Sequence, residues 1–201
     1  MGTIYVLSGI SVAAGSILSA STPHIRYLLA FSGTAHAGYL LSGSGLTLYP
    51  LFLYSLAYTL LLSLFCTVLA GSSLRPALQL SALRGLSNTH PLQATAIQTA
   101  AFGLGGVPPL LGFFSKSYVL LGGICLGNII LQPVLLICFG VAGIVAYLRI
   151  ALVSVGYPQT YNYLVQPKIQ ASPNKGPQAA LLGLVLAGEI LTGDFSLSLL
   201  A

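Results

Sequence analysis

Three titratable side chains lie inside long apolar stretches of this sequence: Lys116, His36 and Glu189. Lys116 is the only Asp, Glu, Lys or Arg between Arg84 and Arg149. A charge at the centre of a bilayer opposes insertion by roughly 2.5–3.5 kcal/mol on insertion scales. Because only 4% of the residues are charged, a lysine retained in such surroundings predicts a group that handles protons or other ions inside a membrane.

The residues before Lys116 predict an interrupted helix. Gly105, Gly106, Pro108 and Pro109 precede it, and proline both lacks an amide N–H and disfavours helix at the residue before it. Broken helices mark the substrate or ion sites of many transport proteins. In the alternative interpretation Lys116 only extends to the membrane surface, but ~15 Å of helix separates it from the end of its apolar stretch.

His36 and Glu189 are the two further candidates for proton transfer. His36 lies well inside the apolar residues 25–41, where it is either a proton relay, since histidine titrates near neutrality, or a neutral side chain hydrogen-bonded between helices. Glu189 lies near the middle of residues 179–195. It is either a proton site or partner of a basic residue, or a carboxylate at a protein contact or at a thin edge of the membrane.

The composition predicts an all-α polytopic membrane protein. Hydrophobic residues make up 56% of the sequence, whereas soluble domains carry about 25% charged residues, so the solvent for most of this surface is lipid or apolar protein. A polar loop is expected at 156–177. We expect about six transmembrane helices, at 4–20, 27–45, 48–71, 91–126, 128–154 and 178–201.

The fourth stretch is too long for one straight span, since its residues would form a helix of about 54 Å. If it crosses once, as a discontinuous helix broken near 105–109, all the basic loops lie on one side of the membrane. If it crosses twice, the basic residues divide between the two sides. The positive-inside rule favours one crossing. The residues that decide this are Arg26, Arg75, Arg84, Arg149, Lys168 and Lys175.

No pattern for a cofactor, a metal or a nucleic acid is present. Cys66, Cys125 and Cys138 lie in apolar runs without a metal or haem spacing, so we expect them to be buried apolar side chains. The basic residues are scattered rather than clustered, and residues 105–106 do not begin a phosphate-binding loop. We therefore expect no cofactor, no metal and no nucleic-acid partner.

Other polar side chains are expected at the edges of the spans. Tyr49, Tyr54 and Tyr58 fit interfacial anchors. His90, before Pro91, fits a boundary residue at the start of the fourth stretch. Thr95, Gln98 and Thr99 either line a watery path to the break or bond to neighbouring helices.

Two segments resemble the proton-translocating antiporter-like subunits of respiratory complex I. They are RYLLAFSGTAHAGY (26–39), and HP (90–91) followed by GGVPPLLGFFSK (105–116). The lysine that ends the second motif is similar to that of the NADH dehydrogenase subunit 2 branch, whereas the subunit 4 branch carries glutamate there. The resemblance covers about 1–155, with departures at Phe31, Gly33 and Ala37, and Glu189 has no counterpart in it.

The resemblance implies a part of a larger assembly. Members of the family have about fourteen helices with two inverted five-helix repeats, and residues 1–155 would match the C-terminal repeat. The implied partners are the other membrane-arm subunits of complex I, lipids, and a separate polypeptide for the N-terminal half, unless the subunit is a reduced one. The implied location is the mitochondrial inner membrane, with a bacterial plasma membrane as the alternative.

The implied function is proton translocation in an NADH:ubiquinone oxidoreductase, with the redox chemistry in other subunits. Lys116 would be the protonatable residue of a half-channel, and His36 would lie on or near the same hydrophilic axis. The alternatives are a subunit of a cation/proton antiporter, a structural membrane-arm subunit without active proton transfer, and a freestanding six-helix transporter.

Overall fold

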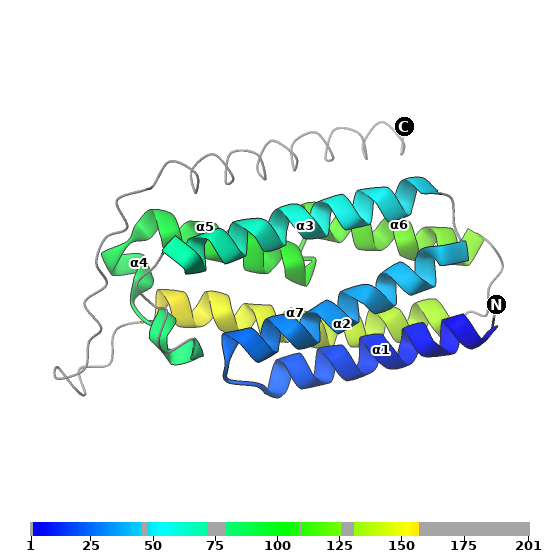
Figure 1. Ribbon diagram of the computed structural model, residues 1–201, viewed down its shortest axis with the longest axis horizontal. Coiled ribbons are helices and arrows are strands. Elements are labelled where there is room, and N and C mark those ends of the chain that lie inside the picture. Colours follow the sequence, from blue (N-terminus) through cyan, green and yellow to red (C-terminus); the bar gives the residue numbers. More distant parts are fainter. Residues whose placement is uncertain (1, 46–47, 72–78, 109, 126–130, 157–201) are drawn as a thin grey trace.

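The computed structural model describes residues 2–156 apart from 46–47, 72–78, 109 and 126–130, and over these residues the chain is a bundle of helices (Figure 1). Within that part no strand forms, and the only β-type pairing is an isolated bridge between His24 and Gln79. The α-helices are α1 (Gly2–Ser21), α2 (Ile25–Ser42), α3 (Leu48–Gly71), α4 (Leu86–Thr89), α5 (Pro91–Gly105), α6 (Leu111–Cys125) and α7 (Leu131–Val155). Short 3₁₀ helices cover Gly43–Gly45 and Leu80–Leu83.

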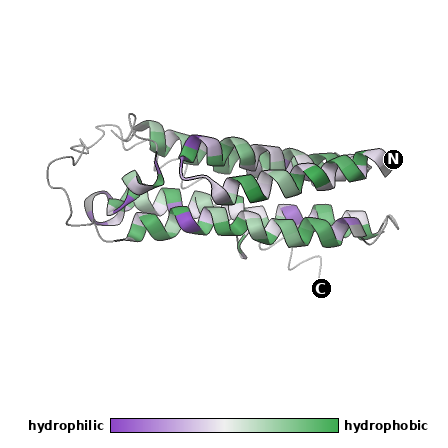
Figure 2. Cartoon of the chain, turned by 90° about the horizontal axis from the view of Figure 1, so that it is seen from below, coloured by the Kyte–Doolittle hydropathy of each residue, from purple (hydrophilic) through white to green (hydrophobic). Residues whose placement is uncertain are grey.

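The fold is that of an all-α membrane protein, as predicted. Within the described residues, α1, α3 and α7 are long and apolar enough to cross a membrane, over Thr3–Ser21, Leu48–Ala70 and Gln132–Val155. Figure 2 shows that hydrophobic residues make up most of the helices along their length. The loop expected at 156–177 and the last helix expected at 178–201 lie outside the described residues.

The fourth apolar stretch forms two half-helices, which confirms the predicted interruption. Helix α5 ends at Gly105 and α6 begins at Leu111. The two follow one another along the length of the bundle, beside α3 (Figure 1). Each has 15 residues, or about 22 Å of helix, so neither half alone spans a hydrocarbon core of ~30 Å.

A tight hairpin of α1 and α2 holds His36 in place. A Cβ atom on Gly15 would lie 2.6 Å from the backbone nitrogen of Ala35, and one on Gly38 would lie 2.9 Å from the carbonyl oxygen of Ser8. Small residues of this kind let membrane helices approach closely. Since α1 also packs on α7, the hairpin fixes the buried face of α2 against the rest of the bundle.

The largest apolar core lies where α2, α3, α5 and α7 meet. Leu28, Phe65, Ile97 and Ile150 are fully buried there. The expectation that the cysteines are buried is wrong for Cys66 and Cys138, which are both exposed at the surface of the chain. Small apolar side chains such as cysteine can face lipid as well as the protein core. An apolar run in the sequence therefore does not distinguish a core position from a lipid-facing one.

Candidate functional site

The carboxyl end of α5 carries a backbone motif that only glycine suits. Gly106 follows the helix with φ of 85°, in the left-handed region. Its N–H donates to the carbonyl of Gly103 at 3.0 Å, and the N–H of Val107 donates to the carbonyl of Phe102 at 3.1 Å. This is a Schellman motif, and it satisfies two of the four carbonyls that a helix end leaves without an intrahelical partner.

Lys116 satisfies the other two carbonyls. Its Nζ donates to the carbonyl oxygens of Leu104 at 3.0 Å and Gly105 at 2.7 Å. A helix end carries roughly half a negative charge, so the interruption creates an electronegative point at the depth of the bundle and the lysine is bound to it. The residues that break the helix and the residue that carries the charge therefore form one unit.

Close packing of the two half-helices makes this reach possible. A Cβ atom on Gly112, in the first turn of α6, would lie 1.7 Å from the carbonyl oxygen of Gly103. One on Gly106 would lie 3.0 Å from Lys116 Nζ. Any larger residue at 112 would push α6 away from α5, and Lys116 would lose its carbonyl partners.

The ammonium of Lys116 keeps one donor after both hydrogen bonds are made, because lysine has three. A neutral amine still has two N–H groups, so both bonds to α5 survive the loss of a proton. The ring of Tyr39 provides a further contact, with its centroid 5.7 Å from Nζ, within the range of a cation–π interaction.

His36 lies on the same interior surface, held by two tyrosines of α3. Its Nδ1 is 2.7 Å from the Tyr54 hydroxyl, and its ring centroid lies 4.4 Å from that of Tyr58. Both Tyr54 and His36 are buried. Tyr54 is therefore a buried hydrogen-bond partner of His36 rather than the interfacial anchor expected from the sequence. Tyr49 is exposed, as expected.

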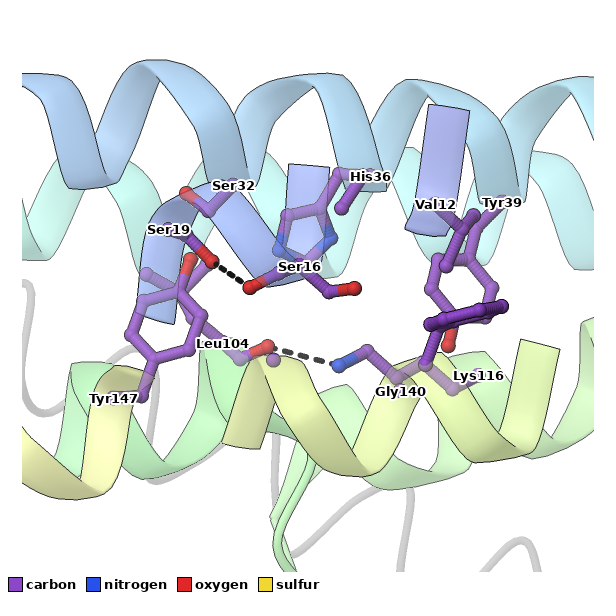
Figure 3. A pocket seen from close by; sticks show the side chains of 13 residues that line it. Val12, Ser16, Ser19, Ser32, His36, Tyr39, Leu104, Lys116, Gly140 and Tyr147 are labelled. Carbon is purple, nitrogen blue, oxygen red and sulfur yellow. Dashed lines mark hydrogen bonds between the residues drawn. The ribbon is translucent and has the colours of Figure 1, made fainter. Parts of the chain in front are cut away.

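Lys116 and His36 line the same two cavities, together with Leu104. The larger offers about 20 Å³ to the centres of water molecules, above the ~10–15 Å³ that one water needs. The smaller, between α3 and the two half-helices, offers about 10 Å³. Figure 3 shows Lys116 extending past His36 toward the Leu104 carbonyl, with serine hydroxyls on the opposite wall.

The structure thus brings together two of the three predicted residues. Glu189 lies outside the described residues, as does Asp194, the other acidic residue of the sequence. His90 occupies the N-cap position of α5, the boundary role expected of it. Gln98 donates to the Ser154 hydroxyl at 2.9 Å, which favours the helix-bonding interpretation for that residue, and Thr95 is exposed.

The sequence analysis missed Tyr54 and Tyr58 as partners of His36. A signal for them existed, because residues four apart lie on one helix face. The hydroxyl-bearing side chains of α1 were also missed, since serine in an apolar helix has no distinctive spacing.

A second cation binds a helix end elsewhere in the bundle. Arg149, in the last third of α7, donates from its guanidinium to the carbonyl of Ala20, in the last turn of α1. This contact joins the last turn of α1 to α7, and neither Ala20 nor Arg149 lines the two cavities beside Lys116. Among the described residues, no group of three or more metal-ligating side chains occurs.

A family model described as "NADH:quinone oxidoreductase/Mrp antiporter, TM" matches residues 1–144. The chain belongs to this family. It is 34% identical over 145 residues to NADH-ubiquinone oxidoreductase chain 2 of Metridium senile, covering 70% of this chain and 37% of that one. It is 39% identical over 114 residues to NADH-quinone oxidoreductase subunit N 1 of Herpetosiphon aurantiacus, covering 53% and 23%.

Solved structures of the family have the same fold. One chain of respiratory complex I from Thermus thermophilus, with bound aureothin, superposes with a TM-score of 0.81 at 28% identity, covering 96% of this chain and 44% of that one. One chain of the Mrp complex from Dietzia sp. DQ12-45-1b gives 0.78 at 19% identity, covering 98% and 45%. The chain therefore spans less than half the length of these relatives.

Proposed function

We propose that this chain is a proton-translocating membrane-arm subunit of an NADH:quinone oxidoreductase and that Lys116 is its protonatable group. One observation carries the proposal: the ammonium is bound to a helix end that exists only because α5 and α6 are interrupted. A lysine that only stabilises the fold does not need an interrupted helix to bind to. A lysine that must hold its place in both protonation states needs partners that bind the amine as well as the ammonium, and two carbonyl oxygens meet that need.

The surroundings of Lys116 favour reversible loss of the proton. No acidic residue lies in the described part of the chain, and burial disfavours the charged form of a lysine. The helix end and the Tyr39 ring favour the charged form. These opposing influences leave the protonated and neutral forms of Lys116 close in free energy. We propose that electron transfer elsewhere changes the charge near Lys116 and so drives release of its proton.

His36 is the proposed relay, because it shares both cavities with Lys116. Tyr54 donates to Nδ1 in this proposal, so the exchangeable proton resides on Nε2. Glu189 remains a candidate proton site of lower rank, with no described contact to support it.

The proposed partners are the other membrane-arm subunits, lipids, and the part of the family's length that this sequence does not span. That part belongs either to a separate polypeptide or to the same chain. Mass spectrometry of the purified complex decides between the two. The proposed location is the mitochondrial inner membrane, with a bacterial plasma membrane as the alternative.

The competing function is that of a subunit in a cation/proton antiporter, since the matching family model covers both types of complex. Purification of the complex through a tag on this chain separates them. NADH:quinone reductase activity in the purified complex supports the proposal, and sodium/proton exchange without that activity supports the antiporter.

The test of the proposal uses Lys116→Ala in the complete complex, reconstituted in sealed vesicles. After assembly is verified, we expect proton pumping coupled to quinone reduction to fall on the order of 100-fold, the lower end of what a proton-transfer group contributes. An assembled variant that pumps like the wild type would leave the chain with a structural role. Gly123→Ala is the matched control on α6, because a Cβ atom there meets nothing within 4 Å.

A further inference from the structure

The side chain of Tyr39 connects α7 to the ammonium of Lys116. Tyr39 is buried, and its hydroxyl donates to the carbonyl oxygen of Leu136 on α7 at 2.8 Å. Its ring centroid lies 5.7 Å from Lys116 Nζ, and both side chains line the larger cavity (Figure 3). One stiff side chain of α2 therefore contacts a fixed point on α7 at its tip and the charged group at its ring.

Gly140 leaves room for the hydrogen bond between Tyr39 and Leu136. A Cβ atom at this position would lie 2.6 Å from the Tyr39 hydroxyl oxygen, but 3.9 Å from the ring carbon that bears it. In an α-helix the N–H of Gly140 donates to the same Leu136 carbonyl. Because a carbonyl oxygen has two lone pairs, the glycine leaves the second one open to the tyrosine.

Neighbouring helices fix the orientation of the Tyr39 ring. Tyr54 of α3 stacks on it, with ring centroids 5.9 Å apart and ring planes at 26°. Val12 of α1 and Val119 of α6 belong to the same buried apolar cluster as the two tyrosines. The position of the ring beside Lys116 is therefore set by packing from three helices and by the hydroxyl contact to a fourth.

The ring distinguishes the two protonation states of Lys116 by its electrostatics. The carbonyls of Leu104 and Gly105 accept hydrogen bonds from an ammonium and from a neutral amine alike. The negative face of an aromatic ring attracts an ammonium, whereas a neutral amine makes only a weak contact with it. Tyr39 therefore stabilises the charged form of Lys116 in particular, and the strength of this effect depends on where the ring lies.

We propose that Tyr39 is a positioning residue for proton transfer: its ring holds the ammonium of Lys116 at the end of α5, and its hydroxyl bond to Leu136, permitted by Gly140, holds the ring. This inference deepens the proposed function and rests on it, because it names the side chain that favours the loaded form of Lys116. It also gives α7 a part in the site, since a displacement of the Leu136 carbonyl moves the ring relative to Nζ.

The first test is a double-mutant cycle at positions 39 and 140, measured as proton pumping by the assembled host complex in sealed vesicles. Gly140→Ala places a Cβ atom against the Tyr39 hydroxyl. Because the end of a side chain yields more easily than backbone, we expect the variant to assemble with a displaced ring and several-fold slower pumping. In Tyr39→Phe/Gly140→Ala the new methyl group fills the place of the hydroxyl at ordinary contact distance.

The double variant is therefore expected to pump faster than Gly140→Ala alone, which is non-additive behaviour. A double variant that pumps no faster than Gly140→Ala overturns the proposal. Gly9→Ala is the matched control, because it also adds a methyl group where α1 faces α7, but its Cβ atom would lie 3.9 Å from the Leu135 side chain. It should pump like the wild type.

The second test separates attraction of the charge from packing of the ring. Phenylalanine with an increasing number of ring fluorine atoms is introduced at position 39 of Gly140→Ala by stop-codon suppression. Fluorine weakens the negative face of the ring and changes its volume little, so pumping is expected to fall stepwise, by roughly 2- to 30-fold over the series. A series that pumps equally well throughout overturns the proposal.

Tyr147 provides the control for the fluorine series. It lines the same cavity from α7, and within the described part of the chain the cation–π contact of Lys116 is made by Tyr39. The same series at position 147 should therefore show no stepwise fall. Equal falls at positions 39 and 147 overturn the assignment to Tyr39.

The two proposals fail separately. If Lys116→Ala abolishes pumping and the fluorine series at position 39 is flat, the proposed function stands and the role of Tyr39 is wrong. If Lys116→Ala pumps like the wild type, the proposed function is wrong. Thermal melting of the complex then still tests the contact between Tyr39 and Gly140, because additive effects of the two substitutions would contradict it.

Discussion

Two cations in this bundle bind the carboxyl ends of helices, and they do so in different settings. Arg149 binds the last turn of α1, where that helix finishes. Lys116 binds the last two carbonyls of α5 at an interruption partway along the bundle. Both contacts satisfy backbone carbonyls and both complement a helix dipole.

The difference lies in the side chain that each position uses. Arginine stays protonated in proteins, whereas lysine loses its proton when its surroundings demand it. Arg149 therefore provides a permanent charge, which suits a fixed helix cap. In the proposed function the charge of Lys116 is switched while its two hydrogen bonds remain. Of the two cations, only Lys116 lines a cavity with His36 that has room for water. Helix capping therefore explains both contacts, but it does not explain why position 116 carries a lysine and position 149 an arginine.

The largest effect is expected from removing the close contact that creates the Lys116 site. Gly112→Ala places a Cβ atom 1.7 Å from the Gly103 carbonyl oxygen, and backbone on both sides leaves little room to relax. We expect a loss of more than about 4 kcal/mol of stability and little assembled complex, measured by native gel electrophoresis and thermal melting. The control Gly123→Ala should assemble normally, and equal behaviour of the two variants would contradict the packing described for α5 and α6.

A smaller effect is expected from Tyr54→Phe. This change tests the role of His36, which lines a cavity with Lys116 and has no counterpart beside Arg149 in the two cavities described. The change removes the hydrogen bond to His36 Nδ1, worth about 1 kcal/mol, and frees the imidazole to change tautomer. We expect normal assembly with a several-fold slower proton pumping rate in vesicles. Tyr49→Phe, also on α3 but 52% exposed, is the control; if both variants pump equally well, His36 is not a relay held by Tyr54.

The smallest effect is expected from Arg149→Lys. A lysine keeps a positive charge near the end of α1 and loses only the planar guanidinium, so the expected destabilisation is within about 1 kcal/mol. Thermal stability and pumping should both stay close to wild type. A strong loss of pumping with intact assembly would place Arg149 on the proton path and remove the distinction between the two cations.

The helices could be predicted from the sequence because lipid imposes their length and composition. Runs of apolar residues predicted the ends of α1, α3 and α7 to within three residues, and the prolines at 108 and 109 predicted the interruption. The expected crossing of the fourth stretch as one discontinuous span rested on placing Lys168 and Lys175 on the same side of the membrane as Arg75 and Arg84. In the structure α5 and α6 follow one another along the bundle (Figure 1).

The contacts of the site could not be predicted in the same way. Nothing in the order of residues says that Lys116 turns back toward Leu104 rather than forward along α6, because that depends on how closely Gly112 approaches Gly103. The same limit applies to Tyr54 and Tyr147. A tyrosine in an apolar helix fits both an interface and an interior, and only the packing of α3 and α7 against α2 and α5 distinguishes them.

The most direct test of the central claim exchanges the two kinds of cation. Lys116→Arg and Arg149→Lys are measured side by side in the assembled complex, as protons pumped per NADH oxidised in sealed vesicles. If Lys116 works by releasing its proton, Lys116→Arg retains a charge at the α5 end but loses pumping almost completely, while Arg149→Lys pumps normally. Wild-type pumping by assembled Lys116→Arg would contradict the claim, since a permanent charge would then suffice at this position.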